Sequence, residues 1–151
     1  MDYTIRRCDI SDLDACVEAY IRTMSAPPWC ERWETATAKR YLGDFMSHVR
    51  AVDIAAVTPG GRVIGAILGY EKSWCSGEEV YIEEFFVVPE YQSRGIGSEL
   101  MQALENYINQ RGIGSIVLMT SRDVPAMQFY KKHGFSVNDN MVLLTKDILY
   151  L

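Results

Sequence analysis

The chain has 151 residues, a formal net charge of −5 and a pI near 5.0, with 48% hydrophobic and 23% charged residues. These are ordinary globular values, and the length predicts one domain over residues 1–151. The acidic balance argues against a nucleic-acid partner, and no apolar run reaches the roughly 20 residues that a membrane helix needs.

The N-terminal residues 1–13 lack the apolar stretch of a secretion signal, so we expect a soluble cytoplasmic protein. The four cysteines, at positions 8, 16, 30 and 75, include no CxxC pair, and the two histidines form no HExxH pattern. We therefore expect free thiols and no metal site.

The first half of the chain reads as a strand, two helices and a three-stranded meander. Alternating polarity marks strands, whereas apolar residues at helical spacing mark helices, and Gly and Pro mark the turns between them. The expected elements are a strand at 4–8, a helix at 11–26, a helix at 34–48, and strands at 52–58, 62–70 and 80–88.

The second half begins with a strand–helix–strand unit. We expect a long helix after the turn at 92–98, ended by Gly112 or Gly114, then a strand at 115–120. Such a crossover is right-handed and leaves its two strands parallel. A short helix at 125–133 and a final strand at 141–146 complete an α/β (α+β) fold.

The turn QSRGIGS (92–98) breaks a local rule, because glycine at a helix start costs roughly 0.5–1 kcal/mol relative to alanine. Close approach of an anion explains the exception. The first amides of a helix lack internal partners and lie at the positive end of its dipole, and Arg94 adds a charge. The turn therefore predicts a pyrophosphate site, although a tight structural turn remains the alternative.

Known nucleotide motifs do not match this turn. A Walker loop needs GKS or GKT, and a dinucleotide loop needs a third glycine where this chain has Leu100. Instead, EEFFVVPEYQSRGIGSEL (83–100) resembles the signature of the GNAT superfamily, the acyl-CoA-dependent N-acetyltransferases. That signature is a strand ending in V-x-P, followed by Q/R-x-x-G-x-G/A at a helix start. AMQFYKKHGF (126–135) resembles the second marker of the family.

The resemblance implies a mixed, mostly antiparallel central sheet of six to seven strands flanked by about four helices. It also implies direct transfer of an acetyl group from acetyl-CoA to an amine, with no metal. In the family, the glycine loop binds the pyrophosphate, and the pantetheine arm pairs with the central strand where that strand bulges. The residues so implied are Phe85, Phe86, Val87, Gln92, Ser93, Arg94, Gly95, Ile96, Gly97 and Ser98. Asp123 stands where many members have an asparagine, so its cofactor contact stays open.

The catalytic roles also follow from the resemblance. Tyr130 matches the family's usual general acid, the donor that reprotonates the leaving thiolate. Glu83 and Glu84 lie where members often place a base, and strand alternation puts them on opposite faces. A carboxylate in a central strand needs a polar cavity, and we favour Glu83 as the base, with pairing to surface cations as the alternative.

The acceptor site is implied at the first two helices. Trp29 and Trp33, in the connector PPWCERW (27–33), could box a cationic amine or anchor the loop on the core. We expect a small-molecule amine, with a protein amine or a non-catalytic acyl-CoA-binding module as alternatives. The apolar residues 147–151 fit either a homodimer contact or packing on their own core.

Overall fold

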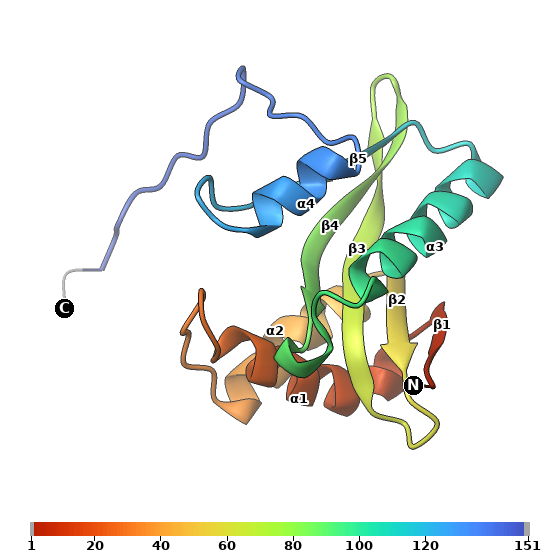
Figure 1. Cartoon of the computed structure of the whole chain (residues 1–151). Coiled ribbons are helices and arrows are strands. Elements are labelled where there is room, and N and C mark those ends of the chain that lie inside the picture. The colour runs from red at the N-terminus through yellow and green to blue at the C-terminus, as the bar shows by residue number, and fades with distance from the viewer. Residues whose placement is uncertain (1, 150–151) are drawn as a thin grey trace. The chain divides into compact units, whose positions relative to one another are not determined.

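The computed structural model describes residues 2–149, which fall into two compact units that divide between Met119 and Thr120. The first unit contains a five-stranded sheet with three helices, and the second contains one helix and an extended segment (Figure 1). No helix among residues 2–149 is both long and apolar enough to cross a membrane.

The sheet has the order β1-β2-β3-β4-β5, with every neighbouring pair antiparallel except β4 and β5, which are parallel. This confirms the mixed, mostly antiparallel sheet and its parallel crossover. The strands are β1 (Thr4–Arg7), β2 (Ala51–Val57), β3 (Val63–Trp74), β4 (Gly77–Val87) and β5 (Ser115–Leu118).

The β3–β4 hairpin is longer than the sequence predicts. The strands expected at 62–70 and 80–88 extend toward each other until two residues remain in the turn, because Ser73 and Trp74 pair with Glu78 and Gly77. Gly77 closes the turn at φ 135°, a backbone conformation that residues with a Cβ rarely adopt.

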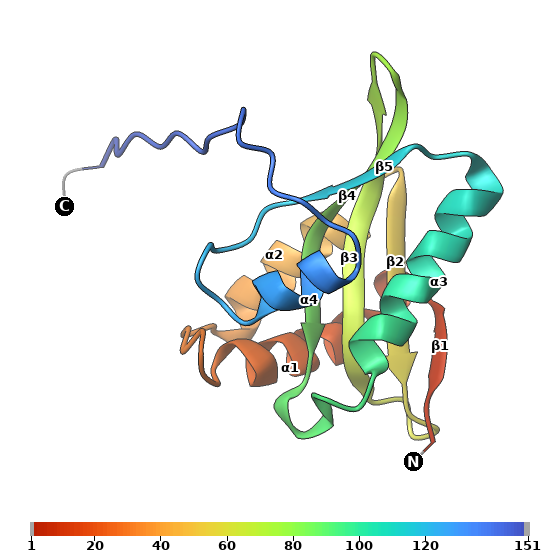
Figure 2. The same ribbon diagram turned by 45° about the horizontal axis from the view of Figure 1, so that its top comes forward.

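The three helices of the first unit cover the two faces of its sheet (Figure 2). Helices α1 (Leu13–Met24) and α2 (Thr35–Met46) pack together on one face, whereas α3 (Ile96–Arg111) packs on the other. Fully buried side chains fill both interfaces, and each contributes about 1.5–3 kcal/mol by burial. The largest are Leu42, Ile64, Ile67, Leu68, Ile96, Leu100, Met101 and Leu104.

Helix α4 (Ala126–Lys132) belongs to the second unit and ends before Gly134, as the sequence predicts. The strand predicted at 141–146 does not form, so the sheet has five strands instead of six or seven. A strand needs the backbone of a neighbour, and residues 141–149 have no ladder partner within the described chain. Their apolar side chains are exposed, with Leu144 at 85%. Residues 150–151 lie outside the described residues.

Candidate active site

The site in the first unit is organised by a β-bulge in β4. Leu68 of β3 pairs with Glu84, but the next residue, Gly69, pairs with Ile82, so Glu83 is an extra residue without a partner. A Cβ at Gly69 would lie 2.6 Å from the carbonyl oxygen of Tyr81. Only glycine therefore allows β3 to approach the bulged strand this closely.

The bulge places Glu83 and Glu84 on the same face, which makes the prediction of opposite faces wrong. Glu84 lies across from Leu68 and receives hydrogen bonds from Tyr20 of α1 and Tyr41 of α2. Glu83 adds to the raised pKa of Tyr41, for which burial is the main cause. Both carboxylates therefore face α1 and α2, because the inserted residue breaks the two-residue alternation.

After the bulge, β4 pairs only with β3 among the strands of the first unit. Its pairs with β5 end at Ile82 and Leu118, whereas its pairs with β3 continue to Val87. The Val88 N–H donates to Ile64 of β3 at 3.0 Å, so Phe86 also directs its backbone groups toward β3. The backbone groups of Phe85 and Val87 consequently face away from β3.

The turn after β4 leads directly into α3. Gln92 Nε2 donates to the carbonyl oxygen of Val87 at 2.9 Å, and Ser93 and Gly95 have φ angles of 62° and 85°. Gly95 caps α3 without a side-chain hydrogen bond, and a Cβ there would have nothing within 4 Å. The start of α3 is thus open to an anion at the end of the helix where its dipole is positive.

Two ion pairs anchor this turn. Glu90 pairs with Arg62 at the start of β3, and with Arg22 of α1 at 3.4 Å. Arg62 and Arg94 both lie against the ring of Tyr91, at 5.8 and 5.5 Å from its centroid. The turn that holds Arg94 is therefore tied to α1 and β3.

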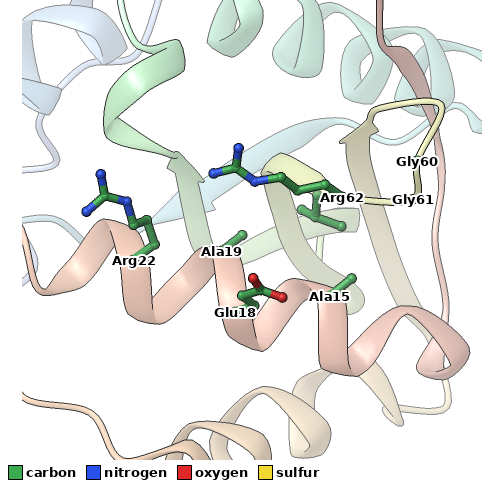
Figure 3. Close-up of a pocket in the computed structure, with 8 residues that line it drawn as sticks. Ala15, Glu18, Ala19, Arg22, Gly60, Gly61 and Arg62 are labelled. Carbon is green, nitrogen blue, oxygen red and sulfur yellow. The ribbon is translucent and has the colours of Figure 1, made fainter.

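Arg22 and Arg62 also line a pocket of about 340 Å³ between α1 and the β2–β3 turn (Figure 3). Glu18 and the glycines of the turn complete its wall. Because Glu90 pairs with both arginines and Glu18 adds a second negative charge to the pocket, we assign this pocket to anchoring of the turn and not to an anionic ligand.

The two glutamates differ in their partners. Oε1 of Glu84 accepts the hydroxyls of Tyr20 at 3.1 Å and Tyr41 at 2.7 Å. Burial raises the pKa of Glu84, and the two hydroxyls oppose that rise. Burial also raises the pKa of Glu83, which has no hydrogen-bond partner among the described residues. Glu83 is consequently the better placed of the two to accept a proton.

Aromatic rings surround Glu84. Trp33 stacks on Tyr41 with centroids 5.0 Å apart and meets Tyr20 edge-on at 5.3 Å, and its Nε1 donates to Glu31 at 2.9 Å. Trp29 is half-buried and takes part in none of the ring contacts found in the described chain. Sequence reasoning missed Tyr20 and Tyr41 as site residues, since no motif marks them and their helical spacing reads as core.

The second unit carries the other two predicted residues. Tyr130 lies on α4, is 8% exposed and packs edge-on against Phe129 and Phe135 at 5.7 and 5.4 Å. Asp123 is exposed in the turn before α4. Among residues 2–149, no three His, Cys, Asp or Glu side chains are grouped so as to hold a metal ion.

Known proteins resemble this chain in sequence. The family model described as "Acetyltransferase (GNAT) family" matches residues 16–135. Aminoglycoside N(6')-acetyltransferase type 1 from Klebsiella aerogenes is 28% identical over 61% of the chain and 70% of its own length. Mycothiol acetyltransferase from an Arthrobacter species is 33% identical over 55% of the chain, but the match spans 27% of that longer protein.

Solved structures share the fold at low identity. An acetyltransferase of Trypanosoma brucei covers 96% of the chain with a TM-score of 0.70 and 21% identity, and the alignment covers 100% of that protein. An aminoglycoside acetyltransferase from an uncultured soil sample gives a TM-score of 0.69, with 99% of both chains covered and 19% identity.

Proposed function

Because the chain belongs to the acetyltransferase (GNAT) family, we propose that it transfers an acetyl group from acetyl-CoA to a primary amine of a small molecule, directly and within a ternary complex. The observation that carries this proposal is the continuous path along β4. The unpaired residue Glu83 of the bulge, a stretch of β4 that pairs only with β3 among the described strands, and a helix start with glycine as its N-cap follow one another there.

The residues present fit acetyl-CoA. The first amides of α3 and the guanidinium of Arg94 bind the pyrophosphate, and the space above Gly95 leaves room for it. The backbone of Phe85 and Val87 pairs with the pantetheine arm, and the Val87 N–H serves as oxyanion donor. The hydrogen bond from Gln92 to the carbonyl oxygen of Val87 stabilises the turn. Asp123 remains a candidate contact.

In the proposed reaction, the side chains of Glu83 and Tyr130 each transfer one proton. An alkyl amine has a pKa near 10.4, so only about one molecule in 10³ is a free base at pH 7. Glu83 accepts the proton of the amine, whose nitrogen forms the new bond to the acetyl carbon as the carbon–sulfur bond breaks. Tyr130 donates its hydroxyl proton to the leaving thiolate, and the second proton that the nitrogen loses as the amide forms restores the Tyr130 hydroxyl through solvent. Acetyl-CoA supplies an already activated thioester, so no protein nucleophile is needed.

The choice of a small acceptor is supported by two acetyltransferases whose names specify aminoglycosides. The direct test is release of free thiol from acetyl-CoA in the presence of polyamines, aminoglycosides, amino acids and lysine peptides. We expect turnover with small amines and none without an acceptor. Turnover with peptides alone would assign a protein acetyltransferase. Binding of acetyl-CoA with no turnover on any acceptor would favour a non-catalytic module.

Phenylalanine in place of Tyr130 should lower kcat about 10²-fold, because the thiolate then leaves without a positioned proton donor. The affinity for acetyl-CoA, measured by calorimetry, should stay unchanged. The matched control is Tyr3→Phe, which removes a hydroxyl that donates to Glu99. Full turnover by Tyr130→Phe would remove Tyr130 from the mechanism.

A further inference from the structure

Three carboxylates gather beside the aromatic cluster in the first unit. Burial raises the pKa of Glu84, and the negative charges of Glu31 and Glu83 raise it further. Glu31 also contributes to the raised pKa of Tyr20 and Tyr41, after burial and Glu84. The three acids therefore share one electrostatic environment around the two tyrosines.

The charge of these carboxylates is not compensated within residues 2–149. Every ion pair found there uses other acids, namely Asp12, Asp14, Glu71, Glu78 and Glu90. Glu31 and Glu84 receive hydrogen bonds only from the neutral donors Trp33, Tyr20 and Tyr41. Glu83 and Glu84 are partly buried, and partly buried charge without a counter-charge is costly, so a cationic ligand would stabilise this site.

Glu84 is oriented to receive such a ligand. Both tyrosine hydroxyls donate to Oε1, and Oε2 accepts no hydrogen bond within the described chain. If Oε2 of Glu84 were fully buried, it would be a buried oxygen without a partner. The single such side-chain oxygen among residues 2–149 is Asp53 Oδ2, so Oε2 of Glu84 keeps some solvent-exposed surface. The tyrosines thus fix the carboxylate with its second oxygen available.

The aromatic rings offer a second attraction for a cation. Trp33 and Tyr41 are both half-buried, so part of their stacked surface stays accessible beside Glu31 and Glu84. An ammonium group near such faces is attracted by the negative potential of the rings, and the carbon chain next to it covers apolar ring surface.

We propose that the acceptor is a polycation with at least one ammonium group besides the amine that reacts at Glu83. Glu84 and Glu31 bind this second group against Trp33 and Tyr41. The inference rests on the proposed function, since it assigns the substrate class of the same site. Glu84, with its two tyrosines, and Glu31 then act as specificity-determining residues.

The test compares polycations with amines that carry one charge. The pairs are 1,4-diaminobutane with n-butylamine, and kanamycin with glucosamine, assayed by thiol release and by calorimetry in the presence of CoA. We expect kcat/KM at least tenfold higher for one or both polycations than for the singly charged counterpart. Glu31→Gln and Glu84→Gln should each reduce that ratio severalfold. Glutamine at position 84 can still accept both tyrosine hydroxyls.

Glu34→Gln is the matched control, because it removes an exposed carboxylate three residues from Glu31. It should leave the ratio unchanged. Equal kcat/KM within both pairs, or a ratio that survives both test variants, would overturn the inference while amine acetylation stands. Polycation binding that weakens in Glu31→Gln without any thiol release would overturn the proposed function and keep the charge assignment. Neither binding nor turnover with any of the four amines would overturn both.

Discussion

Glutamine in place of Glu83 should lower kcat/KM for the amine about 10³-fold at pH 7, the middle of the range for loss of a general base. Glu83 is the unpaired residue of the bulge and accepts no side-chain hydrogen bond within the described chain, and burial raises its pKa. A carboxylate with a raised pKa is a stronger base. Its removal should therefore lower kcat/KM most at a pH where nearly all of the amine is protonated.

The pH profile separates this role from a structural one. The Glu83→Gln variant depends on amine that is already deprotonated, so its kcat/KM should rise about tenfold per pH unit toward pH 10. The wild-type profile should flatten at lower pH, above the pKa of Glu83. Glu79→Gln, the same change on the same strand before the bulge, should resemble the wild type. A parallel loss at every pH would make Glu83 a structural residue.

The strand and helix order could be predicted from the sequence because it rests on local signals. Apolar spacing located each helix, and the glycines at 95 and 112 do cap α3, with φ angles of 85° and 67°. The glycine turn at the start of α3, where we propose that an anion binds, could be predicted for the same reason. Its glycine, its arginine and its helix lie within a few residues of one another.

The bulge could not be predicted, because it depends on two strands at once. Gly69 is the signal on β3, since glycine inside a strand marks a bulge or a close approach. The extra residue, however, lies on β4, and nothing in the sequence of β4 marks Glu83 as unpaired. Alternation therefore fails between Glu83 and Glu84, where the sequence predicts that it holds.

The hydrogen bonds of Glu84 were beyond sequence reasoning for a related reason. Tyr20 and Tyr41 come from two helices that meet only in the folded first unit, and each reads as an ordinary inward residue. The strand expected at 141–146 has the right composition, but composition does not supply a partner. Both failures concern contacts between distant segments.

Asparagine in place of Asp53 should make the protein markedly more stable at pH 8 than the wild type. Asp53, on β2, is 1% exposed, its Oδ1 accepts from the Gly69 N–H at 3.3 Å, and its Oδ2 has no partner. Burial raises its pKa to about 7, and the Gly69 bond and the charge of Arg7 oppose the rise. In the unfolded chain the pKa of an aspartate is about 3.9.

The sign follows from this difference. Between about pH 4 and pH 7 the folded protein keeps a proton on Asp53 that the unfolded chain has released, so stability falls as the pH rises. The loss amounts to roughly 4 kcal/mol and is complete above pH 7. Denaturant unfolding at pH 5 and pH 8 measures it, and Asp53→Asn should lose several kcal/mol less between these values than the wild type.

Comparison with the wild type cancels the titration of all other groups, including Glu83 and Glu84. Asp44→Asn, a change at an exposed position of α2, controls for the altered net charge. An identical pH dependence in the wild type and Asp53→Asn would mean that Asp53 ionises normally in the fold. The expected result would instead show that Asp53, which accepts a hydrogen bond from Gly69 beside the bulge, is neutral in the folded protein in mildly acidic solution.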